Sequence, residues 1–334
     1  MFPYSWRLSD GYPAEGVEPH GLKAFGTFVC GGGSTMGYKL AGFDHLGGVE
    51  IDERMGRLYK ANHRPRHFYL EDIRAFNERD DLPKELYDLD LLDGSPPCSS
   101  FSFAGARGAQ WGKKKKFAEG QKLQRLDDLV FSYVDTILKL RPKTFILENV
   151  VGLMRGNAKP YLRAIFDNLT AGGYSVQAFR LNGATMGLPQ SRERVFVMGR
   201  KAASKLPNIK LSFNERLVPF SEISEDHVAP LTEKYLKYYN ESREGKPVGK
   251  FLSVLRERWN RPAYTICASS NNFHPRQPRE LSDGELIKAG SFPADYDFLG
   301  QSPLYIIGMS VPPIMTARIA HQIYLQWLKR WPSS

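Results

Sequence analysis

The stretch AFGTFVCGGGSTMGYKL, at residues 24–40, decides the fold. Its apolar start, residues 24–29, predicts a buried strand, and Gly31, Gly32 and Gly33 predict a turn into a helix that ends near Leu40. A turn of this kind lets a ligand approach the backbone and adds the N–H donors of a helix N-terminus, although many such turns are plain tight turns. The stretch therefore predicts a strand–turn–helix unit that is suited to binding a ligand.

The same alternation of apolar runs and helical patterns continues to about residue 200. We expect further strands over 48–51, 89–92, 144–147, 176–181 and 195–198, and helices from 52 and over 126–140 and 161–169. Strands that alternate with helices predict an α/β fold, with a doubly wound, mostly parallel sheet. Between 201 and 261 the alternation stops and tyrosines stand among lysines, which indicates a separate small domain.

Composition and charge restrict the class of protein. The chain has 334 residues, of which 42% are hydrophobic and 25% charged, as in soluble globular proteins. No apolar run reaches the roughly 18 residues of a membrane helix, and residues 1–23 lack a signal-peptide pattern, so we expect a cytoplasmic protein. Cys30, Cys98 and Cys267 have no metal-ligand spacing, so we expect no metal site. A net charge of +10 suits a polyanionic partner, although many basic proteins bind no nucleic acid.

Acidic residues end the early strands. Glu50 ends the second strand, where a carboxylate can accept hydrogen bonds from both hydroxyls of a ribose. Asp72 and Ile73 follow the expected third strand, where an aspartate can accept a hydrogen from an adenine amino group. The alternative for Asp72 is a cap for the helix that begins at Ile73.

Cys98 lies in the segment Asp93-Gly94-Ser95-Pro96-Pro97-Cys98, just beyond the strand over 89–92. Open α/β sheets place their sites at this end of a strand. A free thiol has a pKa of about 8.5, so a nucleophilic Cys98 needs activation by donors or positive charge. The alternative is a small buried cysteine.

The segment from Cys98 to about Leu126 shows little apolar periodicity, and loops of this length are functional or disordered. Its basic residues are Arg107, Lys113, Lys114, Lys115, Lys116, Lys122 and Arg125. A basic loop beside a candidate nucleophile predicts closure over a phosphate backbone, and the alternative is a solvated run of charge.

Two further motifs deliver polar groups to the sheet. The strand over 144–147 leads to Glu148 and Asn149, and a partly buried glutamate has a raised pKa and can donate a proton near neutral pH. In extended chain, Arg192 and Arg194 lie on one side, where they are suited to fixing a base carbonyl or a loop. The alternatives are a helix cap at Asn149 and an exposed polar strand edge.

With these motifs in this order, the sequence resembles the DNA (cytosine-5)-methyltransferase family from about Phe25 to Trp327. The matching segments are Pro96-Pro97-Cys98 (the nucleophile motif), Glu148-Asn149-Val150 (the glutamate motif), Gln190 to Arg194 (the Gln-x-Arg-x-Arg motif), Arg279 to Pro293, and Gly308 to Pro313 (the final motif). The resemblance implies the S-adenosylmethionine-dependent methyltransferase fold with a smaller target-recognition domain. It also implies methyl transfer from S-adenosylmethionine to carbon 5 of a cytosine in double-stranded DNA.

The resemblance implies a role for each catalytic residue. Cys98 adds to carbon 6 of the cytosine, and Glu148 protonates or hydrogen-bonds ring nitrogen 3. Arg194 holds the carbonyl oxygen of the base and Arg192 steadies the Cys98 loop. Because carbon 6 is hidden in a stacked duplex, the base must be flipped out, and closure of the loop over 105–121 would then hold it.

The resemblance also implies a set of cofactor-binding residues: Phe28, Gly31, Gly32, Gly33, Ser34, Glu50, Ile51, Asp72, Ile73, Pro97, Met309 and Ser310. Three positions depart from the family pattern near this site. Cys30 stands where a glycine is usual, Ser34 where an aromatic residue or leucine is frequent, and Met309 where an asparagine is usual.

From this resemblance we expect four segments: an N-terminal arm (1–23), a catalytic and cofactor-binding domain (24–200), a target-recognition domain (201–305) and a C-terminal helical segment (306–334) that returns to the catalytic domain. We expect a monomer on DNA, of bacterial or phage type, with a cognate restriction endonuclease as partner. One alternative is an RNA cytosine-5 methyltransferase, but the Cys-Phe-Thr signature of the tRNA-acting branch is absent. The other is a catalytically silent DNA-binding regulator, against which the presence of Cys98, Glu148 and Arg194 argues.

Overall fold

The structure is a computed structural model, and it describes residues 2–97, 129–227, 229–248, 251–269 and 271–332. Cys98 and all the basic residues of the segment that follows it lie outside the described residues. The helix expected over 126–140 is observed as α4 (Leu129–Leu140), and its predicted start also lies outside them.

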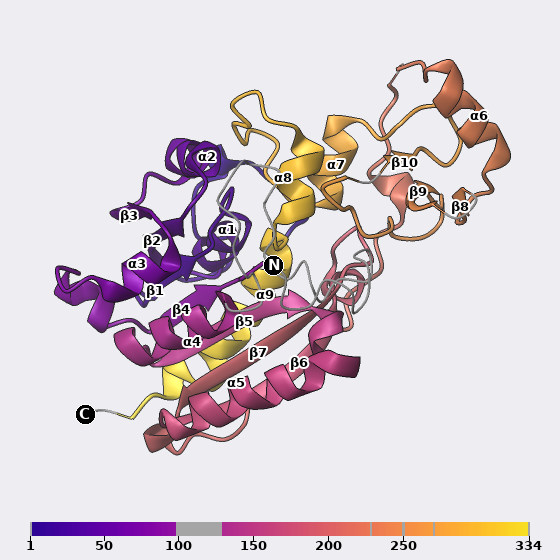
Figure 1. Cartoon of the computed structure of the whole chain (residues 1–334). Helices are drawn as coiled ribbons and strands as arrows, with labels where there is room; N and C mark the ends of the chain where they lie inside the picture. Colours follow the sequence, from indigo (N-terminus) through magenta and orange to yellow (C-terminus); the bar gives the residue numbers. More distant parts are fainter. Residues whose placement is uncertain (1, 98–128, 228, 249–250, 270, 333–334) are drawn as a thin grey trace.

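A seven-stranded sheet forms the centre of the molecule, in the order β3-β2-β1-β4-β5-β7-β6 (Figure 1). The strands are β1 (Lys23–Thr27), β2 (Asp44–Glu50), β3 (His67–Leu70), β4 (Leu91–Gly94), β5 (Thr144–Val150), β6 (Tyr174–Asn182) and β7 (Glu193–Lys201). β1 to β5 pair in parallel, and β7 pairs antiparallel with both β5 and β6. The connection from β6 to β7 is short, spans residues 183–192 and contains the 3-10 helix Gly183–Met186, as is typical of antiparallel neighbours. The predicted mostly parallel α/β sheet is confirmed.

Helices cover both faces of this sheet (Figure 1). One core contains α1 (Gly33–Leu40) and α9 (Pro313–Gln326), and the other contains α3 (Ile73–Glu78), α4 and α5 (Lys159–Ala171); α2 (Glu53–His63) follows β2. Successive strand residues enter opposite cores, as Ala24 and Phe25 do. Strands that are buried on both faces explain the continuous apolar runs of the sequence.

The N-terminal arm packs against the chain near residues 291–295. The indole N–H of Trp6 donates to the Ser291 carbonyl at 3.0 Å, and the backbone N–H of Ala294 donates to the Trp6 carbonyl at 2.8 Å. Phe2 and Trp6 are both buried. The arm thus joins the two ends of the chain within one core.

A smaller sheet of β8 (Pro247–Val248), β9 (Phe251–Arg256) and β10 (Asn271–Phe273), with α6 (Glu233–Glu241), lies at one end of the molecule (Figure 1). The chain then returns through α7 (Asp283–Ala289) and α8 (Pro303–Met309). Ile209, Phe220 and Ile306, near the two ends of the range expected for the small domain, share a core with α1 and α9. The boundaries 201 and 305 stay a prediction.

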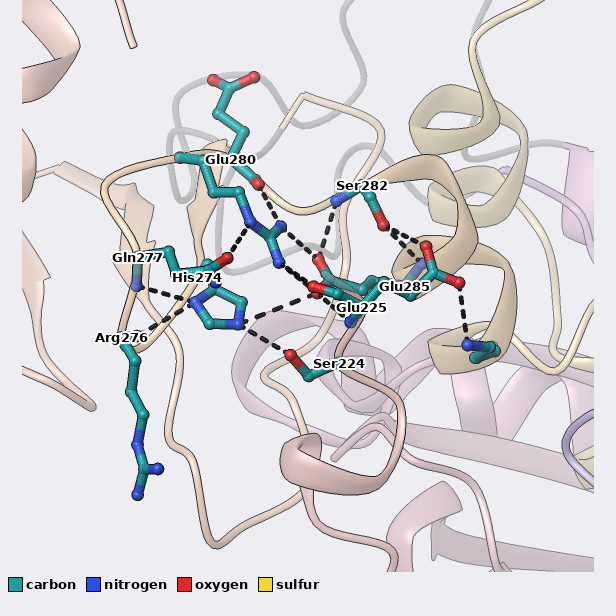
Figure 2. A network of polar contacts seen from close by, with 10 residues as sticks. Ser224, Glu225, His274, Arg276, Gln277, Glu280, Ser282 and Glu285 are labelled. Carbon is teal, nitrogen blue, oxygen red and sulfur yellow. Dashed lines mark hydrogen bonds and ion pairs between the residues drawn. The ribbon is translucent and has the colours of Figure 1, made fainter. Parts of the chain in front are cut away.

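A buried network connects this small sheet to α7 (Figure 2). Arg279 donates to both carboxylate oxygens of Glu285, at 2.8 and 2.7 Å, and Ser282 and Glu285 form a capping box at the start of α7. Burial opposes ionisation of Glu285, but hydrogen bonds from Arg279 and from backbone N–H groups keep its pKa below the ordinary value. His274, which follows β10, contacts Ser224 at 2.9 Å. These contacts join the segment that follows β10 to the start of α7.

Within the described ranges, no helix is long and apolar enough to span a membrane. The same residues contain no His, Cys, Asp and Glu group that is arranged to hold a metal ion.

Candidate active site

A cavity of about 500 Å³ opens at the carboxyl ends of the parallel strands. Thirteen of the residues expected at the site line it: Phe28, Gly33, Ser34, Glu50, Ile51, Asp72, Ile73, Pro97, Glu148, Arg192, Arg194, Met309 and Ser310. The order of the strands spreads these residues along one edge, from Asp72 after β3 to Arg194 on β7. One cavity therefore brings together residues from the expected catalytic set and from the expected cofactor-binding set.

Glu50 lies at one end of this cavity and is held by three backbone donors. It accepts hydrogen bonds from the N–H groups of Cys30 (2.7 Å), Ile51 (2.9 Å) and Asp52 (2.9 Å). Burial raises its pKa, although these hydrogen bonds oppose the rise. A carboxylate offers about four acceptor positions, so three donors leave one for a ligand hydroxyl rather than the two expected from sequence.

Asp72 caps a helix, as in the alternative considered for it, and it also lies at the cavity, where the adenine contact stays a prediction. Its side chain accepts from the N–H of Arg74 at 2.8 Å and so caps α3, and it also lines the cavity. Ile51 and Met309 at the cavity wall are 40% and 46% exposed. Exposed apolar side chains beside fixed carboxylates suit a flat, partly apolar ligand such as a nucleoside.

Gly31 and Gly32, both expected at the cofactor, do not line the cavity. A Cβ on Gly32, which has φ +83°, would lie 2.0 Å from the His63 ring. The Gly31 carbonyl accepts hydrogen bonds from Tyr296 and His63, at 2.5 and 3.2 Å. These two glycines thus permit close packing behind the turn, while Gly33 reaches the cavity.

The turn also contains strained backbone. Phe28 and Cys30 adopt φ values of +56° and +48°, which residues with a Cβ rarely do. Both line the cavity, and the backbone N–H of Cys30 is the donor that holds Glu50 at 2.7 Å. The strain therefore occurs where the turn positions Glu50.

Glu148 and Arg194 form an ion pair at the other end of the cavity, with Arg194 Nε 3.0 Å from Glu148 Oε1. β5 and β7 are neighbours in register, which brings the two side chains together. Burial raises the pKa of Glu148, and Arg194 and Arg192 oppose the rise without cancelling it. A largely buried carboxyl group with a raised pKa beside a guanidinium is suited to sharing a proton with a polar ring.

Arg192 is buried and holds carbonyl groups of the chain. It donates to Ile266 (2.8 Å), Gly308 (3.0 Å) and Ser310 (2.9 Å). Gln190 is also fully buried, and accepts from the N–H of Ile266. An exposed strand edge, the alternative for this motif, is therefore wrong. The contact expected between Arg192 and the Cys98 loop involves residues outside the described ones.

Comparison with known proteins decides the family. The model of the family described as C-5 cytosine-specific DNA methylase matches residues 23–227. The chain belongs to this family. It is a DNA (cytosine-5)-methyltransferase, of a family that takes its methyl group from S-adenosylmethionine.

Curated relatives agree with this assignment, and a solved structure agrees with the fold. Type II methyltransferase M1.HphI of Haemophilus parahaemolyticus is 26% identical over 326 residues, which cover 89% of this chain and 85% of the relative. M.NgoPII of Neisseria gonorrhoeae is 27% identical over 347 residues, covering 90% and 95%. A prophage-encoded Escherichia coli protein, assigned as a DNA modification methyltransferase, superposes with a TM-score of 0.70 at 19% identity and covers 91% of this chain and 99% of its own.

Among the described residues of the methyltransferase, Asp93 is a buried carboxyl group that the sequence motifs did not assign to the site. Asp93 lies in β4, one residue before the end of the strand; it is 4% exposed and accepts a hydrogen bond from the Tyr38 hydroxyl at 2.7 Å. Burial raises its pKa to about 7. An aspartate that follows the apolar run 89–92 and precedes Gly94-Ser95-Pro96-Pro97 is the signal that could have indicated it.

Proposed function

We propose that this methyltransferase modifies carbon 5 of a cytosine that is flipped out of duplex DNA at a specific sequence, with Cys98 as its nucleophile. One observation carries the proposal. A single cavity joins a nucleoside-type end, at Glu50 and Asp72, to the Glu148–Arg194 pair, and Pro97, the residue before Cys98, lines the same cavity.

S-adenosylmethionine would supply an activated methyl group when bound. Glu50 would accept a hydrogen bond from its ribose, and Ile51 and Ile73 would enclose its adenine next to Asp72. Phe28, Gly33, Ser34, Met309 and Ser310 complete the wall. The remaining acceptor position on Glu50 and the apolar walls fit this nucleoside, which supports the assignment.

The residues at the other end would act on the base. The Cys98 thiolate forms a bond to carbon 6, which makes carbon 5 nucleophilic so that it takes the methyl group. Glu148 gives a proton or a hydrogen bond to ring nitrogen 3 as the thiolate adds, and Arg194 binds the carbonyl oxygen. Loss of the carbon 5 proton then breaks the bond to carbon 6 and restores the thiolate.

Arg192 would act indirectly. By binding the carbonyl groups of Gly308 and Ser310, it fixes the final motif against the cavity wall. The residues 201–305, which include the small sheet, are the part of the chain that we propose reads the DNA sequence. In a restriction–modification system of the cytoplasm, the partner would be an endonuclease that cuts the same sequence.

Methyl transfer from labelled S-adenosylmethionine tests this function. The full chain is incubated with duplex DNA of varied sequence, with tRNA, or with no nucleic acid. We expect label in duplex DNA alone, at one sequence, and bisulfite mapping should locate it on cytosine. Label in tRNA would favour the RNA alternative, and label in neither nucleic acid would favour the silent regulator.

Replacement of Lys113, Lys114, Lys115 and Lys116 by alanine should weaken DNA binding and reduce its salt dependence. The slope of log affinity against log salt should fall by about 0.9 for each lysine that contacts a phosphate. Fluorescence anisotropy with labelled duplex at several salt concentrations measures this slope. A variant in which Lys329 and Arg330 become alanine is the control, and an unchanged slope in the lysine variant would show that these lysines do not contact phosphate.

A further inference from the structure

Asp93 is a buried carboxyl group that the proposed mechanism does not use. It accepts a hydrogen bond from Tyr38 at 2.7 Å, and the side chain of Ser34 and the N–H of Gly94 also hydrogen-bond to it. Ser34 lines the cavity, and Asp93 is not part of the cavity wall. A carboxylate that interacts with a residue of the cavity wall can act on the charge of a ligand without touching it.

The order of the strands indicates which part of the ligand lies near Asp93. Glu50 ends β2 and Glu148 lies on β5, and β1 and β4 lie between these two strands (Figure 1). A nucleoside held at Glu50 and a base held at Glu148 therefore place the group that passes between them over β1 and β4. Neighbouring strands are about 4.8 Å apart, so Asp93 on β4 lies close to this position.

We propose that Asp93 is a positioning residue that acts through Ser34 and makes the cavity prefer a cationic cofactor to its neutral product. The inference rests on the proposed cofactor, S-adenosylmethionine. Its sulfonium is positively charged, whereas the product S-adenosylhomocysteine has a neutral thioether and is otherwise the same. Ionised Asp93 accepts the Ser34 hydroxyl hydrogen, which directs the lone pairs of Ser34 to the cavity, and its charge attracts the sulfonium. Loss of this attraction after methyl transfer favours release of the product.

Of the titratable groups that face Asp93, Glu148 is the one whose ionisation could also change the ratio of the two affinities. Among the described residues these are Tyr38 on α1, Tyr59 on α2, Tyr133 on α4 and Glu148 on β5. Burial raises the pKa of each tyrosine, so all three stay neutral near pH 7. Glu148 is paired with Arg194 but also titrates, so it needs its own control.

The sign of the pH dependence follows from the charge of the cofactor. Asp93 becomes ionised as the pH rises through about 7, and the sulfonium stabilises the ionised form. Affinity for S-adenosylmethionine should therefore increase with pH, and binding near pH 7 should release a proton. Affinity for S-adenosylhomocysteine should show neither effect at Asp93.

Isothermal titration calorimetry of the full chain with S-adenosylmethionine and with S-adenosylhomocysteine tests the inference. The affinities are measured between about pH 6 and about pH 8. Two buffers of different ionisation enthalpy report the number of protons released on binding. In the wild type, the ratio of the two affinities should rise about tenfold toward high pH, with proton release on S-adenosylmethionine binding. Asp93→Asn keeps an acceptor for Tyr38 and Ser34 but has no charge, so its ratio should be about tenfold lower at high pH and independent of pH. Glu148→Gln should keep this dependence on pH, shifted toward lower pH because the charge of Glu148 raises the pKa of Asp93.

Three results would overturn the inference. The first is a wild-type affinity ratio that does not change with pH. The second is an Asp93→Asn variant with the wild-type affinity ratio. The third is loss of the pH dependence of this ratio in Glu148→Gln. If neither compound binds, the proposed cofactor is wrong as well, which separates the two failures. If Asp93→Asn does not fold, as judged by circular dichroism, the wild-type proton release and the Glu148→Gln variant still decide.

Discussion

Replacement of Cys98 by serine should abolish methyl transfer to duplex DNA, while the fold and the affinity for S-adenosylmethionine survive. A hydroxyl group is a much weaker nucleophile than a thiolate, so we expect the rate to fall by about a thousandfold or more. A single-turnover assay with labelled S-adenosylmethionine measures the rate, and calorimetry measures cofactor binding.

Cys267→Ser is the matched control. Cys267 is exposed and has no part in the proposed chemistry, so this variant should transfer methyl groups at the wild-type rate. Wild-type activity in Cys98→Ser would remove Cys98 from the mechanism. Loss of activity in both variants would indicate that general damage, and not the missing thiolate, explains the effect.

Replacement of Glu148 by glutamine should lower kcat by about a hundredfold or more, with little change in cofactor affinity. Glutamine keeps the shape of the side chain but cannot transfer a proton to ring nitrogen 3. Because burial raises the pKa of Glu148, the protonated form persists to higher pH than in an ordinary glutamate. The wild-type rate of the methyl-transfer step should therefore fall as the pH rises through that pKa, and this fall should be absent from Glu148→Gln.

Glu193→Gln provides the comparison. Glu193 neighbours Arg194 in sequence, but its own ion pair with Arg180 is on the surface, where such pairs contribute little. Its kcat should stay within about twofold of the wild type. A glutamine at 148 that keeps wild-type kcat would show that Glu148 does not handle a proton in the rate-limiting step.

The sequence predicted the sheet well because its central strands β1, β2 and β4 are buried on both faces. Apolar residues such as Ala24 and Phe25 enter opposite cores, which makes each strand a short apolar run that is easily recognised. The candidate site follows from the same pattern, since parallel strands bring their carboxyl ends to one edge. Glu50, Asp72 and Glu148 were therefore expected together, and all three line one cavity.

Contacts between distant parts of the chain were not predictable from local patterns. Arg192 binds carbonyl groups at Ile266 and Ser310, which are 74 and 118 residues away. The indole of Trp6 binds Ser291 across 285 residues. Gly31 and Gly32 carry the motif of a ligand-binding turn, but Gly32 is packed against His63, which no spacing in the sequence indicates.

The most direct test of the mechanism is to trap the bond between Cys98 and the base. Duplex DNA that carries 5-fluorocytosine at the target position is incubated with the full chain and S-adenosylmethionine. The fluorine cannot leave as the proton does, so we predict a stable covalent complex, with the modified cytosine attached to Cys98 in a peptide identified by mass spectrometry. DNA that binds with the cofactor present but forms no adduct, or an adduct at another residue, would contradict the mechanism.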